Sequence, residues 1–294
     1  MEKRARFKSR WLPYALVAPQ IAVTLLFFFW PAVQALYQSV LIQDAFGTSS
    51  QFVWFDNFRD LFNDSNYIES FKTTAIFSVL VAFFGLALAL ILAIFADRVV
   101  KGAAVYKTFL IWPYAVSPVV VGVLWMFLMN PTLGVIAHAL RHVGIEWNNL
   151  LNGTHAMILI VMAAVWKQIS YNFLFFLAGL QAIPKSLIEA AAIDGAGPVK
   201  RFVTIVFPLL SPTTFFLLVI NMVYSFFDTF AIIEATTHGG PGQDTEILVY
   251  KVFIDGFKSG DIGSSAAQSV VLMVIVIALT VVQFKYVERK VQYS

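Results

Sequence analysis

The sequence lacks cysteine altogether and is poor in charge. None of its 294 residues is cysteine, so the chain offers neither a disulfide framework nor a thiolate for chemistry. Only 13% of the residues are charged, whereas a soluble globular domain carries roughly 25%. The shortage of charge excludes an ordinary soluble domain.

The short motifs of nucleotide-binding and hydrolytic sites are also missing. The sequence contains no Gly-x-x-x-x-Gly-Lys-Ser/Thr loop, no Gly-x-Ser-x-Gly and no His-Glu-x-x-His. His138 and His142 have the spacing of two ligands on one helix face but no third ligand nearby, which disfavours a metal site. We therefore expect a protein that is not an enzyme and binds no cofactor or metal of its own. Energy for any work must come from a partner or from an ion gradient.

Long apolar runs dominate the sequence. Hydrophobic residues make up 59% of the chain, and the mean hydropathy is +0.78. Six runs are long enough to cross a hydrocarbon core of about 30 Å. They cover residues 14–42, 71–96, 105–129, 156–180, 206–235 and 266–286. Because backbone groups in lipid must be bonded internally and no barrel pattern is present, these spans are predicted to be helices.

The fold prediction is thus an all-α membrane protein with six transmembrane helices and a single transmembrane domain over residues 1–294. The first run follows basic residues, as in a signal peptide, but its apolar part is too long and lacks a clear cleavage site. We expect an uncleaved helix. Four prolines interrupt the runs and are candidates for kinks: Pro113, Pro118, Pro208 and Pro212.

Basic residues indicate the orientation. Most lie on one side of the predicted spans: Lys3, Arg4, Arg6, Lys8, Arg10, Arg98, Lys101, Lys107, Lys185, Lys200, Arg201, Lys285, Arg289 and Lys290. The positive-inside rule makes this side cytoplasmic, so both termini are predicted to be cytoplasmic. The net charge of +3 then reflects membrane topology, and we expect a lipid bilayer but no nucleic acid as a partner.

A polar insert interrupts the apolar pattern at about residues 181–205, on the predicted cytoplasmic side. Pro184 suits a helix start, residues 186–193 favour helix, and the run from Asp194 to Pro198 favours a stop followed by a new start. The pattern predicts two short helices joined by a sharp turn. A plain polar connection would have a similar composition, but the ordered glycines and prolines favour a docking element.

The residues of this insert resemble the signature loop of inner-membrane permease subunits of binding-protein-dependent ABC importers. The resemblance rests on Glu189, Ala190, Ala191, Gly195, Ile205 and Pro208, with Phe207 where the family usually has leucine. It implies the bundle of type I importer permeases, on which the insert couples transport to an ATPase. Glu189 and Asp194 would make charged contacts there, and Gly195 would let the backbone turn.

Other segments are similar to the carbohydrate-uptake branch, and among these to the A-type permeases of sn-glycerol 3-phosphate importers. They are residues 11–14, 112–118, 167–176, 226–230 and 264–269. This resemblance implies uptake of sn-glycerol 3-phosphate, or a related glycerophosphodiester or sugar, through a bacterial inner membrane. It also implies a heterodimer with a second permease, two ATPase subunits that bind ATP and Mg, and a periplasmic solute-binding protein.

Polar side chains inside two spans are candidates for the solute pathway, because such groups are costly in lipid and usually face a cavity or another helix. The fourth span carries Lys167 and Tyr171 on one face, with Gln168 and Asn172 beside it. The fifth carries a stripe that includes Asn221, Ser225 and Asp228, next to Tyr224.

Two interpretations of these residues remain open. In one, they line the translocation pathway and bind the solute. In the other, Lys167 and Asp228 neutralise each other while the amides tie helices together. The competing function is a self-sufficient secondary transporter that uses Lys167, Asp228 or Glu234 as an ion or proton relay.

Overall fold

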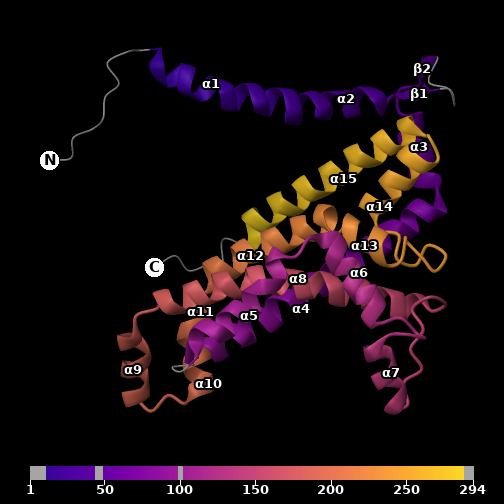
Figure 1. Ribbon diagram of the computed structural model, residues 1–294. Helices are drawn as coiled ribbons and strands as arrows, with labels where there is room; N and C mark the ends of the chain where they lie inside the picture. The colour runs from indigo at the N-terminus through magenta and orange to yellow at the C-terminus, as the bar shows by residue number, and fades with distance from the viewer. Residues whose placement is uncertain (1–10, 44–48, 99–101, 288–294) are drawn as a thin grey trace. The chain divides into compact units, whose positions relative to one another are not determined.

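The computed structural model describes residues 11–43, 49–98 and 102–287 (Figure 1). The basic residues of the predicted cytoplasmic side at positions 3–10, 101, 289 and 290 lie outside these ranges. Within the described residues the chain forms two compact units. The first contains the residues up to Asn63 together with Val252–Val271, and the second contains Asp64–Lys251 and the residues from Leu272 on.

The first unit begins with a long apolar helix. Helix α1 (Leu12–Thr24), a π-helical turn (Leu25–Phe29) and α2 (Trp30–Gln38) form 27 continuous residues without one buried side chain. A hairpin of β1 (Leu41–Gln43) and β2 (Ser50–Phe52) follows, with Leu41 opposite Phe52. The prediction that the first span extends to residue 42 is therefore wrong, because the backbone groups of residues 41–43 pair with a second strand. The hairpin is also the one departure from an all-helical fold among the described residues.

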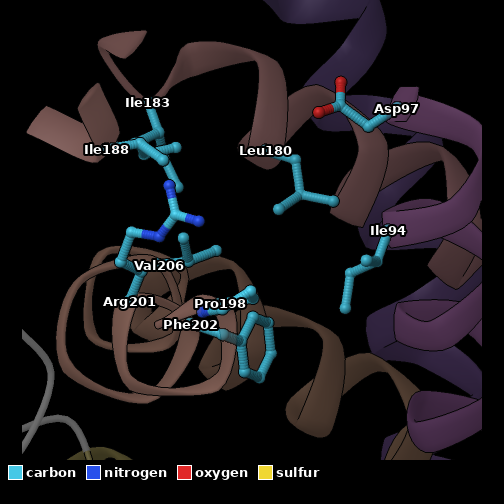
Figure 2. A pocket seen from close by; sticks show the side chains of 9 residues that line it. All are labelled: Ile94, Asp97, Leu180, Ile183, Ile188, Pro198, Arg201, Phe202 and Val206. Atoms are coloured by element: carbon cyan, nitrogen blue, oxygen red, sulfur yellow. The ribbon is translucent and has the colours of Figure 1, made fainter. Parts of the chain in front are cut away.

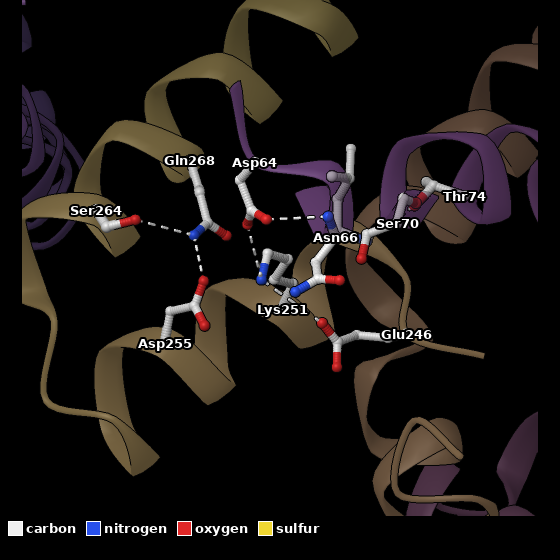
Figure 3. Close-up of polar contacts among 10 residues, drawn as sticks. Asp64, Asn66, Ser70, Thr74, Glu246, Lys251, Asp255, Ser264 and Gln268 are labelled. Atoms are coloured by element: carbon white, nitrogen blue, oxygen red, sulfur yellow. Dashed lines mark hydrogen bonds and ion pairs between the residues drawn. The ribbon is translucent and has the colours of Figure 1, made fainter. Parts of the chain in front are cut away.

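Asn57 holds this hairpin against the chain that follows it. It lies on α3 (Asp56–Asn63), and its Nδ2 donates to the carbonyl oxygens of Ser39 and Leu41 at 2.8 and 2.9 Å. The first unit is completed by the end of α14 (Leu248–Phe253), a π-helical turn (Ile254–Lys258) and the first half of α15 (Ile262–Val282). There Gln268 Nε2 donates to Asp255 Oδ2 at 2.5 Å (Figure 3).

The second unit is built around two long helices, α4 (Ser65–Arg98) and α8 (Gly153–Ala182), which pack along each other. The contact is close because α4 presents Ala89, Ala93 and Ala96 to Phe173 and Phe176 of α8. Small residues of this kind let helix backbones approach in a membrane. The arrangement leaves α8 as the central helix of the unit.

Shorter helices surround α8. Helices α5 (Ala103–Ala115), α6 (Pro118–Leu128), α12 (Ser211–Val223) and α13 (Phe230–Thr236) all contact it. The remaining elements are α7 (Val135–His142), α9 (Lys185–Ile193), α10 (Pro198–Arg201), α11 (Phe207–Leu209) and π-helical turns at Phe202–Val206, Tyr224–Asp228 and Gln283–Val287.

Two predicted spans are broken rather than continuous. The chain bends by 103° between α5 and α6, and by 65° between Pro198–Leu209 and Ser211–Asp228. The breaks lie at Pro118 and Pro212, two of the four prolines considered as kinks, because proline lacks the N–H that a continuous helix needs. Four helices are long and apolar enough to cross a membrane, or up to six if each bent pair is one span. The count of six remains a prediction.

Residues 237–251 form one connection of the second unit, which folds back and is held by ion pairs and a hydrogen bond. Lys251 Nζ lies 3.7 Å from Asp64 Oδ2 and 3.8 Å from Glu246 Oε1, with only 8% of the lysine side chain exposed (Figure 3). The Leu248 N–H donates to Thr74 Oγ1 at 2.8 Å. A buried charge is tolerated only when it is paired. These contacts join the connection to the start of α4.

Candidate functional site

The predicted insert forms the expected pair of short helices. Helix α9 ends at Ile193, and α10 begins at Pro198. Between them Gly195 has φ of +81°, in the left-handed region that only glycine adopts without strain. The Ala196 N–H donates to the Ala191 carbonyl at 2.9 Å and so closes the end of α9. The turn predicted at Gly195 is confirmed.

The outer surface of the insert combines apolar and acidic side chains. Ile193 and Val199 are 87% and 77% exposed, and the side chains of Glu189 and Asp194 are exposed beside them. Figure 1 shows α9 and α10 projecting from one end of the second unit. Large apolar side chains held in the open, with charges next to them, are typical of a surface that binds another protein.

The inner surface of the insert is anchored to the bundle. Ile188 and Phe202 pack against a buried cluster of Ile183, Val206 and Leu210. The signature residues Ile205 and Pro208 are half-buried in the chain that leads back to α12, while Ala190 is exposed and Ala191 is half-buried on α9. The two short helices are therefore attached through apolar contacts and do not hang on a free loop.

A cavity of about 210 Å³ lies under the insert. Figure 2 shows the guanidinium of Arg201 pointing into it, with Asp97 of α4 on another wall. Arg201 Nε is buried and has no hydrogen-bond partner among the described residues. The other lining residues are Ile94, Leu180, Ile183, Ile188, Pro198, Phe202 and Val206. From the sequence, Arg201 is predicted only to be a basic residue of the cytoplasmic side. The spacing of the residues around it does not indicate a cavity.

Five of the seven predicted pathway residues meet at a second cavity, of about 390 Å³. They are Lys167, Gln168, Tyr171, Tyr224 and Asp228, joined by Tyr114, Pro118, Ile220 and Val223. The lining comes from α5, α6, α8, α12 and the π-helical turn Tyr224–Asp228. Tyr114 and Pro118 were not predicted as pathway residues. They line the cavity because the break between α5 and α6 lies against α8.

Lys167 and Asp228 line the same cavity without forming an ion pair among the described residues. Lys167 Nζ instead donates to the carbonyl oxygens of Val116 at 2.6 Å and Tyr114 at 3.3 Å. It also lies 5.8 Å from the centre of the Tyr114 ring. The predicted neutralisation of Lys167 by Asp228 is therefore absent in this conformation.

The other two predicted pathway residues, Asn172 and Asn221, bond to each other. Each side-chain amide donates to the other's carbonyl oxygen, at 3.1 and 2.8 Å, and both residues are completely buried between α8 and α12. They are not among the residues that line the cavity. In this conformation they tie two helices together, as in the structural alternative, and their role toward a solute stays a prediction.

The polar residues predicted to form one stripe on the fifth span do not all face the cavity, because the helix is irregular at residues 224–228. Residues 224–228 form a π-helical turn, in which hydrogen bonds run from residue i to i+5. The wider turn shifts the residues that follow it around the helix axis. Asp228 therefore faces the cavity, whereas Asn221 and Ser225 are completely buried. A sequence periodicity of 3.6 residues could not show this shift.

A further polar cluster joins Glu234 of α13 to residues 237–251. Tyr250 Oη donates to Glu234 Oε2 at 2.6 Å, and His238 Nδ1 lies 3.5 Å from the same oxygen. Burial and the bonded Glu234 carboxylate raise the pKa of Tyr250 above its ordinary value, so the hydroxyl keeps its proton. Glu234 does not line the cavity that contains Lys167 and Asp228. No group of three or more His, Cys, Asp or Glu residues within the described ranges could hold a metal ion.

Apolar helices with broken spans, a polar cavity along them and a projecting helix pair fit a multi-pass membrane transport subunit. The chain belongs to the family of binding-protein-dependent transport system inner membrane components, whose model matches residues 85–293. It is therefore an inner-membrane protein. The match includes both the insert and the polar cavity.

Two relatives show the extent of the similarity. The chain is 62% identical over 292 residues to the sn-glycerol-3-phosphate transport system permease protein UgpA of Rhizobium meliloti strain 1021, covering 99% of this chain and 100% of the relative. It is 58% identical over 291 residues to the protein of the same name from Pectobacterium atrosepticum, covering 99% of both.

Solved structures share the fold. A chain of a bacterial ABC transporter involved in the import of the acidic polysaccharide alginate superimposes with a TM-score of 0.82, at 23% identity, over 95% of this chain and 96% of that one. A chain of the bacterial alginate ABC transporter in complex with an alginate pentasaccharide-bound periplasmic protein gives a TM-score of 0.83, at 22% identity, over 97% and 96%. At these identities the likeness establishes the helical type I importer permease fold.

Proposed function

We propose that this chain forms half of the translocation pathway of an ATP-driven importer for sn-glycerol 3-phosphate, or a related glycerophosphodiester or sugar. The solute is supported by relatives of that name that are about 60% identical over nearly the whole chain. Six membrane crossings with both termini in the cytoplasm fit the charge distribution of the sequence. The sequence contains no ATP-binding motif, so in this proposal a partner binds and hydrolyses the ATP.

The proposed partners are a second permease subunit, two ATPase subunits and a periplasmic solute-binding protein. The family is defined by its dependence on a binding protein, and the alginate transporter with the same fold was solved with a periplasmic protein bound. ATP and Mg would bind to the ATPase subunits. This chain would contribute the membrane pathway and the contact that transmits ATPase closure.

The observation that carries the proposal is the exposed surface of the insert at residues 181–205. Ile193 and Val199 form an apolar patch next to Glu189 and Asp194, and its opposite side is fixed to the bundle through Ile188. A rigid element of this kind can dock in a partner and move with it, so that closure of the ATPase switches the bundle between two access states.

The cavity of Lys167, Gln168, Tyr171, Tyr224 and Asp228 is the proposed solute pathway. It offers an ammonium, an amide and the phenols of Tyr114 and Tyr171 as hydrogen-bond donors for a hydroxylated or phosphorylated solute, whereas the Tyr224 hydroxyl donates to the Ala164 carbonyl at 3.3 Å. Asn172 and Asn221 would join it only if the helices that they connect move apart. Lys167→Ala is expected to lower uptake while leaving the complex assembled, and loss of assembly would instead assign Lys167 a structural role.

The decisive experiment is uptake of labelled sn-glycerol 3-phosphate by proteoliposomes that contain the complete complex. Uptake should persist when ionophores collapse all ion gradients and should stop when internal ATP is removed. The opposite result would favour the secondary transporter. The placement of Glu234 outside the cavity of Lys167 and Asp228 already disfavours a relay through all three groups.

A further inference from the structure

The break between α5 and α6 leaves backbone carbonyls without helical partners. Val116 and Ser117 are both extended, with ψ of 133° and 142°, so α5 ends at Ala115 and cannot continue into α6. Pro118 begins α6 and has no N–H to offer. The last carbonyls of a helix need another donor, and irregular backbone within a membrane is tolerated where it packs against protein or lines a water-filled cavity. A donor from elsewhere in the bundle that bonds to these carbonyls therefore stabilises the bent form.

Lys167 of α8 supplies that donor. Its Nζ donates to Val116 O at 2.6 Å and to Tyr114 O at 3.3 Å, at the end of α5 and just beyond it. A cation at this position also interacts favourably with the negative end of the helix dipole. The side chain thus crosses from the central helix to hold the bent form of the neighbouring one.

The same ammonium faces the solute cavity. Lys167 lines it together with Gln168, Tyr171 and Asp228. An ammonium has three donors, and two of them account for the bonds to the carbonyls of Tyr114 and Val116. Asp228 in the same cavity is an anion and repels another anion. An anionic solute that enters the cavity therefore finds its favourable charge at Lys167.

We propose that the Lys167 ammonium holds the break between α5 and α6 in its bent form, and that an anionic solute releases the break by taking over this ammonium. The proposal rests on the proposed function, since the anion is the phosphate of the transported solute. Lys167 acts here as a positioning residue and as the sensor of an occupied cavity. The same helix ends at Ala182, where the insert begins, so the event is linked covalently to the coupling surface.

The lack of cysteine in this chain provides a direct test. Ser117→Cys places a single exposed thiol at the break, and its labelling by a membrane-impermeant maleimide is followed in the complete complex, with any cysteines of the partner subunits replaced. Lys167→Met should slow labelling at least fivefold without solute, because the bent form, in which residue 117 is extended and exposed, loses its donor. Lys167→Arg keeps donors for the carbonyls and should stay within twofold of the parent. Lys72→Met, which removes an exposed lysine of α4, is the matched control and should change nothing.

Added ligands test the release. With Lys167 present, sn-glycerol 3-phosphate should slow labelling, whereas glycerol, which lacks the charge, should not. In Lys167→Met the phosphate compound should have no further effect. Equal labelling of Lys167→Met and the parent would overturn the holding role. An equal response to sn-glycerol 3-phosphate with and without Lys167 would overturn the release.

A second variant keeps the proposal testable if the Lys167→Met complex does not assemble. Pro118→Ala restores an N–H that can continue the helix across the break while it leaves Lys167 in place, so labelling of Ser117→Cys should again slow. An unchanged rate would count against the proposal. ATP-driven uptake by the parent complex in the same vesicles separates the two hypotheses. If the parent complex takes up sn-glycerol 3-phosphate but the labelling rate does not depend on Lys167, only the holding role is rejected. If the labelling rate depends on Lys167 but sn-glycerol 3-phosphate is not taken up, only the proposed solute is rejected.

Discussion

Two connections that lie near opposite ends of α8 differ in whether their side chains bond within the protein or are exposed. Near its start, residues 237–251 make their contacts within the second unit. Lys251 pairs with Glu246 and Asp64, and Asp244 packs so tightly against Gly153 that a Cβ added to Gly153 would collide with the Asp244 carboxyl group. At its end, the insert exposes Ile193, Val199 and its acidic residues. The 30 residues of α8 separate the two by about 45 Å.

This difference indicates different roles. A connection whose polar groups are satisfied internally has a shape that does not depend on a partner. The insert is anchored on one side only, and its exposed apolar side chains remain to be covered by another protein. We therefore expect changes in the insert to affect transport while sparing the bundle, and changes in residues 237–251 to affect stability first.

The largest effect is expected at the turn of the insert. Gly195→Pro cannot reach φ of +81°, because proline is fixed near −65°, and Glu189→Lys reverses a charge on the docking surface. Each should lower uptake at least tenfold while the complex still hydrolyses ATP, measured in parallel on the same proteoliposomes. Gly197→Ala is the control, since Gly197 has φ of −66° and open space around it. Normal coupled uptake in both variants would reject the docking role.

The next effect concerns Lys251. Lys251→Met removes the ammonium that lies 3.8 Å from Glu246, whose side chain is only 10% exposed, and removing one charge of a buried pair costs about 3 kcal/mol. We expect the unfolding temperature of the purified permease to fall by several degrees. Asp64→Asn should cost much less, because that carboxylate is 38% exposed and water screens it. Equal losses in the two variants would show that burial does not control the stability of this segment.

The sequence predicted the features that depend on local chemistry. Hydropathy located the long helices, and the glycine and proline spacing located the turn at Gly195 and the two short helices beside it. It could not show that Lys167 would bond to Val116 O, because that contact joins residues far apart in the chain through a bend of 103°. The π-helical turn at Tyr224–Asp228 and the strand at Leu41–Gln43 were also missed, since one irregular helical turn and a three-residue strand leave no distinct hydropathy pattern.

The smallest effect is expected at Asn172 on α8 and Asn221 on α12, which lie between the two connections. The two amides bond to each other across α8 and α12, and Asn221 Nδ2 also donates to Leu217 O at 2.7 Å within α12. A double-mutant cycle of Asn172→Ala and Asn221→Ala isolates the bond between the helices and should give a coupling free energy of about 0.6 to 1.7 kcal/mol, as for other hydrogen bonds between membrane helices. Chemical or thermal unfolding of the four proteins measures it. If the pair only ties helices together, the solute concentration for half-maximal uptake stays unchanged in Asn172→Ala. A rise of tenfold or more would place the asparagines in the pathway, and would mean that α8 and α12 separate during transport while both ends of α8 remain attached to their connections.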